Sequence, residues 1–135
     1  LARSTRRPGA RTRQALRIMG RTRNVPATTP GTVEDHGTVT GTPFGRGSIV
    51  LVGRLANQRL TGTFRLLLAR GSVTGTVSLP YTIRGNQITF VGTGRLTGGT
   101  GAYRGVTSDT LQIRDTNTLP DGQNGRVSVR GNATY

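Results

Sequence analysis

The stretch Gly92-Thr93-Gly94-Arg95-Leu96-Thr97-Gly98-Gly99-Thr100-Gly101-Ala102-Tyr103-Arg104-Gly105 decides the fold. Its first half alternates Gly or Leu with Thr or Arg, which is the period-two pattern of a half-buried strand. The alternation ends at 98–101, where three glycines favour a tight corner. An aromatic residue and an arginine, Tyr103 and Arg104, follow before the chain extends again. We therefore predict a strand, then a corner, then a tyrosine that closes one end of a β structure.

The same alternation occupies four segments of the chain. They are 59–68, 72–83, 87–97 and 126–135. In 72–83 the odd positions are Val, Gly, Leu, Tyr and Ile, whereas most even positions are Ser or Thr. Such segments predict strands with one buried face. We also predict a first strand within 14–24, and the more continuously apolar run 48–55 predicts a strand covered on both faces.

Short connections join these segments. Asn57-Gln58, 69–71 and 84–86 have the length and the Gly or Asn content of hairpin turns. Successive hairpins build an antiparallel meander, and closing such a sheet removes its exposed edges. We therefore predict an all-β fold, a small closed antiparallel β-barrel of about eight strands. A β-sandwich is the alternative.

Several glycines fall on the predicted inner face of the barrel. They are Gly62, Gly75, Gly92, Gly94 and Gly131. Glycine bends strands where a barrel turns a corner. Missing side chains would equally leave an interior cavity for a ligand, and the two interpretations are compatible.

Charge is the second marked feature of the chain. The 135 residues carry a net charge of +14, and all 19 basic residues are arginine. The length predicts one domain, so we expect a basic flexible arm in residues 1–13 and a single barrel domain in residues 14–135. A surface of this charge attracts polyanions. The candidate polyanion-binding residues in the arm are Arg3, Arg6, Arg7, Arg11 and Arg13; four more arginines, Arg65, Arg95, Arg126 and Arg130, fall on predicted outer faces.

Few residues offer acid–base or metal chemistry. The chain has five carboxylates, and none of them lies between His36 and Ser108. The central strands therefore provide no carboxylate pair for acid–base chemistry. The single histidine belongs to a loop-like cluster, Glu34-Asp35-His36, and cysteine is absent, so we predict no metal site. No serine lies in a Gly-x-Ser-x-Gly elbow. We therefore assign no catalytic residue.

Three segments together resemble the core of allene oxide cyclase-like and dirigent-like barrels. They are Gly-Thr-Val-Ser-Leu-Pro-Tyr-Thr-Ile (75–83), Gln-Ile-Thr-Phe-Val-Gly-Thr-Gly (87–94) and Thr-Gly-Gly-Thr-Gly-Ala-Tyr-Arg-Gly-Val (97–106). The resemblance covers roughly residues 37–115. It implies an eight-stranded barrel with an apolar interior, no cofactor, and either a cofactor-free isomerase or cyclase or a stereo-directing protein. The polar pocket residues of these families have no matching motif in this sequence.

The leading functional prediction is a barrel that binds a hydrophobic small molecule. The candidate ligand-binding residues are Tyr81, Phe44, Pro43, Phe64 and Phe90. We expect the pocket to open at the end opposite Tyr103, near Pro43, Phe44 and Tyr81. The alternatives are a non-catalytic structural barrel that forms homo-oligomers through its Thr-rich surface, and polyanion binding through the Arg-rich arm.

Location and membrane contact follow from the same residues. No apolar run approaches the roughly 20 residues of a membrane helix, and six aromatic residues are too few for the girdles of a membrane barrel. The resemblance implies a secreted or exported protein. The absence of cysteine suits an oxidising compartment and the cytoplasm equally.

Overall fold

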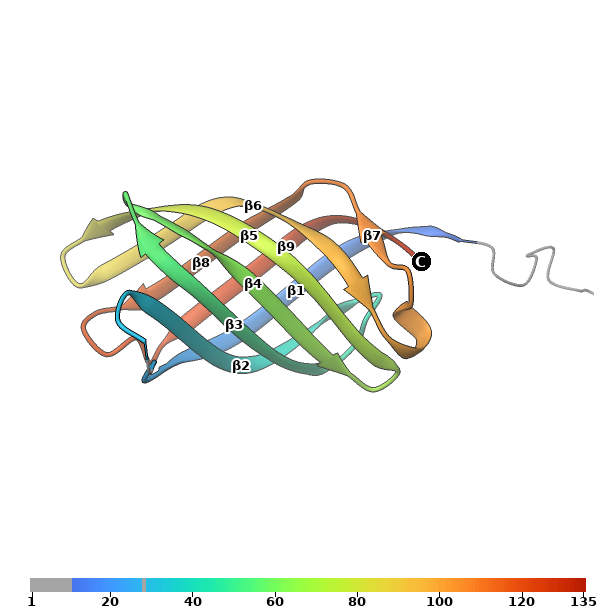
Figure 1. The fold of residues 1–135 in the computed structure, drawn as a ribbon, viewed down its shortest axis with the longest axis horizontal. Helices are drawn as coiled ribbons and strands as arrows, with labels where there is room; N and C mark the ends of the chain where they lie inside the picture. Colours follow the sequence, from blue (N-terminus) through green and yellow to red (C-terminus); the bar gives the residue numbers. More distant parts are fainter. Residues whose placement is uncertain (1–10, 28) are drawn as a thin grey trace, which may run out of the picture.

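The alternating segments form long antiparallel strands. The computed structural model describes residues 11–27 and 29–135. Within this part the strands are β1 (Arg13–Val25), β2 (Thr32–Thr42), β3 (Gly47–Ala56), β4 (Arg59–Leu68), β5 (Gly71–Arg84), β6 (Gln87–Gly99), β7 (Thr107–Ser108), β8 (Leu111–Thr118) and β9 (Gly125–Thr134). A short 3-10 helix, η1 (Gly101–Tyr103), follows β6. Strands β3, β4 and β5 cross β1, β8 and β9 obliquely in the view of Figure 1.

Pairing between the first and last strands closes the sheet. The order around the wall is β1-β2-β3-β4-β5-β6-β8-β9, and β9 pairs again with β1 from Arg13–Thr134 to Thr22–Gly125. The two-residue strand β7 adds to the end of β9. The predicted small closed antiparallel β-barrel is therefore confirmed, with eight strands in its wall, and the sandwich alternative is wrong.

The predicted hairpin turns lie where expected. Asn57 and Gln58 have φ of 55° and 57°, and positive φ at both central residues defines the type I′ turn that matches the twist of a two-stranded hairpin. Gly85 has φ of 58° in the two-residue turn between β5 and β6. These tight turns fix the register of the meander from β3 to β6.

The barrel wall begins earlier than residue 14. The backbone N–H of Thr12 donates to the carbonyl of Tyr135 at 3.0 Å, and the N–H of Tyr135 donates back at 3.3 Å. The Arg11 guanidinium donates to the Thr107 hydroxyl at 2.7 Å. Residues 11–13 thus lie on the barrel, and the rest of the predicted arm lies outside the described residues.

Side chains fill the interior and explain the inner-face glycines. A Cβ atom on Gly75 would lie 2.4 Å from the Phe64 ring, and one on Gly94 would lie 2.7 Å from Ile113 Cδ1. Phe64 and Gly75 are directly opposite in the β4–β5 register. These two glycines therefore make room for large neighbours of the same core, and the space that they leave is occupied.

Two local expectations are wrong. The run 48–55 is not covered on both faces, because a single sheet forms the wall and Val52 remains 42% exposed. The cluster 34–36 is not a loop, since it pairs within β2 to both β1 and β3. The sequence pattern does not indicate a strand here because Asp35 faces inward, where an apolar residue is expected.

Aromatic rings close one end of the barrel, which we call the tyrosine end. Tyr103 is 2% exposed, and its ring centroid lies 4.9 Å from that of Phe44 and 5.3 Å from that of Tyr135. The expectation that Tyr103 closes one end is therefore confirmed. The expectation that Phe44 lies at the opposite end is wrong, because Phe44 belongs to the same aromatic cluster.

Tyr103→Ala should lower the free energy of unfolding by about 3–5 kcal/mol, as expected when a large buried aromatic side chain leaves a cavity. Tyr81→Ala, at a half-buried position, is the matched control and should cost less. Urea denaturation followed by circular dichroism measures both. Equal losses would contradict the assigned role of Tyr103.

Candidate functional site

The five residues predicted to bind a hydrophobic ligand do not form one site. Phe44 and the adjacent Pro43 lie at the tyrosine end. Tyr81 and Phe90 contact each other at the other end, with ring centroids 5.5 Å apart and ring planes tilted by 57°. Phe64 lies in the core against Gly75. The candidate ligand-binding residues therefore lie in three separate places, at the two ends of the barrel and in its core.

The interior cavity is small. Its volume is about 40 Å³, and its lining combines core side chains such as Leu16, Ile49 and Ile113 with two polar residues, Thr22 and Asp115. Cavities for drug-sized ligands measure about 300–1,000 Å³. The space inside the barrel suits about one to three water molecules.

Polar residues gather inside the barrel at the end away from Tyr103, which we call the aspartate end. The buried polar side chains there are Thr22, Asp35, Asp115 and Asn117. Asn24 Nδ2 donates to Asp35 Oδ1 at 3.3 Å. Thr22 Oγ1 and Asp115 Oδ1 have no hydrogen-bond partner among the described residues, and both residues line the small cavity. A water molecule in this cavity would satisfy them.

Burial changes the acidity of both interior carboxyl groups. Desolvation and, to a smaller extent, the negative charge of Asp35 together raise the pKa of Asp115 to about 7. Desolvation also raises the pKa of Asp35, while the hydrogen bond from Asn24 and the charge of His36 oppose this rise. Asp115 therefore keeps its proton inside the barrel below about pH 7.

Sequence patterns do not reveal that these two carboxyl groups share the interior, because they come from β2 and β8, which lie far apart in the sequence. One sequence pattern does indicate an inward carboxyl group. The inward-facing row of β8 begins with apolar residues and continues into polar ones: Leu111, Ile113, Asp115 and Asn117. A carboxyl group with a raised pKa is a candidate general acid. The apolar lining and small volume leave no room for a substrate beside it.

The unfolding free energy should fall as pH rises from about 4 to about 7. An unfolded aspartate loses its proton near pH 3.8, whereas Asp115 in the fold keeps its proton until about pH 7, so the folded state binds more protons in this window. The loss should total about 2–4 kcal/mol and level off above pH 7.

Asp115→Asn should remove most of this dependence and be more stable than the parent chain at pH 8. Asp121→Asn, in an exposed turn, is the control and should behave as the parent chain does. Denaturation curves at pH 5 and pH 8 test both, and a parent chain of equal stability at the two pH values would contradict the assignment.

Arginines cover the outer surface of β1, β9 and β8. We call this surface the cationic face, formed by Arg17, Arg21, Arg114, Arg126 and Arg130, all exposed. Arg17 lies directly opposite Arg130, and Arg21 lies directly opposite Arg126. Between these rows, Ser128 lies opposite both Met19 and Arg114. Directly opposite residues are about 4.5–5.5 Å apart at Cα, and like charges there destabilise a sheet.

Carboxylates do not compensate the cationic face. The ion pairs within 4 Å in the described part of the chain are Arg13–Asp109, at 3.6 Å, and His36–Glu34, at 3.0 Å. Asp35 and Asp115 are buried, and Asp121 accepts from the backbone of Gln123. All five carboxylates of the chain are thus placed elsewhere.

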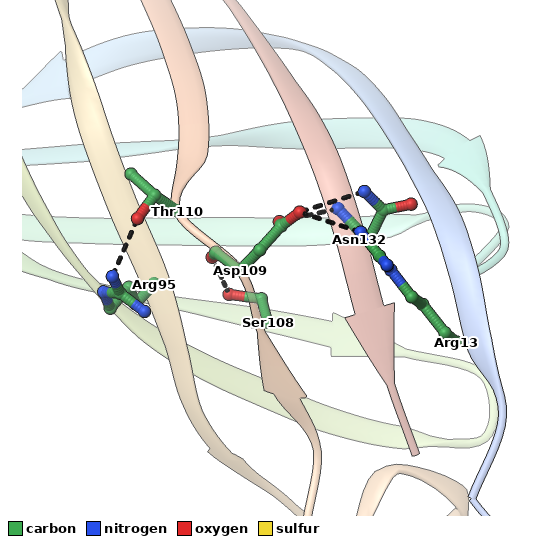
Figure 2. Close-up of polar contacts among 6 residues, drawn as sticks. All are labelled: Arg13, Arg95, Ser108, Asp109, Thr110 and Asn132. Carbon is green, nitrogen blue, oxygen red and sulfur yellow. Dashed lines mark hydrogen bonds and ion pairs between the residues drawn. The ribbon is translucent and has the colours of Figure 1, made fainter.

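Neighbouring arginines outside the cationic face do have partners (Figure 2). The Asp109 carboxylate forms an ion pair with Arg13. It also accepts hydrogen bonds from the backbone and side-chain N–H groups of Asn132, each at 2.9 Å. The hydrogen bonds from Asn132, more than the charge of Arg13, lower the pKa of Asp109. Arg95 donates to the Thr110 hydroxyl at 2.7 Å. Among the described residues, no comparable ion pair or side-chain hydrogen bond holds the five arginines of the cationic face.

A solvent-filled groove extends from the cationic face across β1 and β2. Its volume is about 1030 Å³. Arg114 and Arg126 line it on the β8–β9 side, Met19 and Arg21 on β1, and Arg46 in the turn after β2. Of the predicted arm residues, Arg11 and Arg13 hold the start of the barrel wall, and Arg3, Arg6 and Arg7 lie outside the described residues.

Replacing one arginine of a facing pair should stabilise the barrel. Arg126→Gln should raise the free energy of unfolding by about 0.2–1 kcal/mol, because it removes a like charge directly opposite Arg21. The gain should shrink in high salt, which screens exposed charges. Arg65→Gln, opposite Thr74 and Val50, is the control. A loss of stability in Arg126→Gln would show that the pair is not repulsive.

These features define a small closed β-barrel with a nearly filled interior and a cationic outer surface. Comparison with known proteins finds no matching family model, no matching curated protein and no matching solved structure. The resemblance to allene oxide cyclase-like and dirigent-like barrels stays a prediction. No helix in the described ranges is long and apolar enough to cross a membrane. Residues 11–27 and 29–135 contain no group of three or more His, Asp or Glu side chains placed to hold a metal ion.

Proposed function

We propose that this protein binds polyanions through the cationic face. The observation that carries the proposal is the register of β1 on β9, which sets Arg17 against Arg130 and Arg21 against Arg126 with no carboxylate in reach. Solubility requires charge but not this arrangement, which costs stability. A bound anionic chain would offset the repulsion.

The dimensions of the two cavities favour the outer surface. The interior holds about 40 Å³ and the outer groove about 1030 Å³. A hydrophobic ligand would have to enter a barrel packed with its own side chains. A polyanion needs no interior space, because guanidinium groups bind phosphate or sulfate oxygens at the surface, often through two parallel hydrogen bonds. Hydrophobic-ligand binding and oligomer formation stay predictions.

Binding should depend strongly on salt and only weakly on sequence. Each arginine that neutralises an anionic group releases bound counterions, so the logarithm of the affinity falls with the logarithm of the salt concentration. The six aromatic residues of the chain are Phe44, Phe64, Phe90, Tyr81, Tyr103 and Tyr135, and none lies on the cationic face. Stacking on nucleic-acid bases is therefore not available there.

The test is titration of a fluorescent inorganic polyphosphate at several salt concentrations. The double variant Arg126→Gln/Arg130→Gln should bind more weakly, with the salt slope reduced by about 2, one unit for each lost contact. The control Arg54→Gln/Arg65→Gln removes the same charge from exposed positions on β3 and β4 and should change affinity much less.

Equal losses in the two double variants would show that net charge alone attracts the polyanion and that the cationic face is not the site. Binding by the parent chain that is indifferent to salt would also overturn the proposal. Deleting residues 1–10 separates the contribution of the arm from that of the face.

A further inference from the structure

We infer that the polyanion is an anionic polysaccharide and that it lies along the groove of the cationic face. The inference rests on the proposed function and names the chemical class of its ligand. It is carried by the composition of the groove, which combines positive charge, hydroxyl groups and an exposed apolar side chain.

Three kinds of group line the groove together. The arginines are Arg21, Arg46, Arg114 and Arg126; the hydroxyl residues are Thr38, Thr40, Thr116 and Ser128; and the apolar side chains include Met19 and Ala69. Met19 is 68% exposed on the outer face of β1, between Arg17 and Arg21. A methionine placed outward among arginines offers a soft apolar contact that adapts to its ligand.

A sugar chain with acidic substituents matches all three. Its sulfate, phosphate or carboxylate groups pair with guanidinium groups. Its ring hydroxyls exchange hydrogen bonds with threonine and serine hydroxyls. Its ring C–H faces cover Met19. Inorganic polyphosphate presents charge and hydrogen-bond acceptors but no apolar face, so it would leave Met19 without a contact.

A nucleic acid matches the groove less well. Single strands bind proteins through base stacking on aromatic side chains as well as through charge. The aromatic residues of this chain lie at the tyrosine end, in the core or in the Tyr81–Phe90 contact, and none lines the groove. Phosphate contacts alone would remain.

The groove is long enough to require a chain instead of a single ion. It reaches from Arg114 on β8 across β9 and β1 to Thr38 and Thr40 on β2, and on to Arg46. Three steps between neighbouring strands span about 14 Å. A ligand that contacts the arginines at both ends must cross the threonine pair on β2.

The test compares a heparin-derived octasaccharide with inorganic polyphosphate of the same number of charges, by calorimetry at one salt concentration. The variant Thr38→Val/Thr40→Val removes both hydroxyls but keeps the side-chain volume and the strand preference. The octasaccharide should lose about tenfold in affinity, as expected for two neutral hydrogen bonds. Polyphosphate binding should stay within about twofold, because its affinity comes from charge.

The control is Thr63→Val/Thr76→Val, a directly opposite and exposed pair on β4 and β5, which should change neither affinity. If Thr38→Val/Thr40→Val is poorly folded, Ser128→Ala on β9 and Met19→Gln on β1 provide the same comparison of octasaccharide and polyphosphate affinity. Each should weaken octasaccharide binding selectively by about threefold.

The outcomes separate the inference from the proposed function. If Thr38→Val/Thr40→Val affects both ligands equally, or affects neither, the ligand is not a polysaccharide bound along the groove. The proposed function would still stand in that case, provided that Arg126→Gln/Arg130→Gln weakens polyanion binding. Tighter binding of a single-stranded oligonucleotide of equal charge would overturn the polysaccharide inference as well. Failure of every polyanion to bind the parent chain would remove the proposed function and the inference together. A parallel titration with an oligogalacturonate shows whether carboxylated sugars bind as sulfated sugars do.

Discussion

The pairing of β1 with β9 is the constraint on which the rest of the structure depends. Once the sheet closes, each wall residue points either into the barrel or out to solvent, in strict alternation. A shift of one residue would exchange the two sets. The observed register puts Leu16 and Ile18 inside and Arg17 and Arg21 outside. The core and the cationic face are therefore two results of one register.

The interior of the barrel is nearly filled by its own side chains. Phe64 covers Gly75, and the aromatic cluster around Tyr103 closes one end, so little space remains for a ligand. The polar groups of the interior are compensated only in part, since Thr22 Oγ1 and Asp115 Oδ1 have no hydrogen-bond partner among the described residues. Asn24 bonds Asp35, and Asp115 takes up a proton in preference to holding an unpaired buried charge. Below about pH 7, protonation of Asp115 spares the barrel a second buried charge.

The sequence predicts the barrel well because alternation and short turns report on local geometry. Asn57-Gln58 predicts a hairpin turn from two residues, and the structure has the turn there. The end at which Phe44 lies is also implicit in the sequence: four antiparallel strands, β3 to β6, separate its turn from the corner before Tyr103, so an even number of reversals returns the chain to the same end.

Long-range features escaped prediction because no local pattern encodes them. Asp35 and Asp115 are 80 residues apart in the sequence and share one interior only because the sheet closes. Arg21 and Arg126 are directly opposite for the same reason. Inward aspartates also break the apolar row by which strands are recognised, which is why 34–36 resembled a loop. The cationic face is visible in the composition, but its facing pairs require the register of β9 on β1.

The arginines of β1 and β9 bear on how the chain reaches its fold. These two strands meet across almost the whole length of the chain, and contacts of such sequence separation form slowly in β proteins. Until they meet, β1 and β9 are the open edges of a partly folded sheet, which invite pairing with other molecules. Exposed arginines on both edges, Arg17 and Arg21 on β1 and Arg126 and Arg130 on β9, make such encounters repulsive. The same side chains that burden the finished barrel would protect it from aggregation during folding.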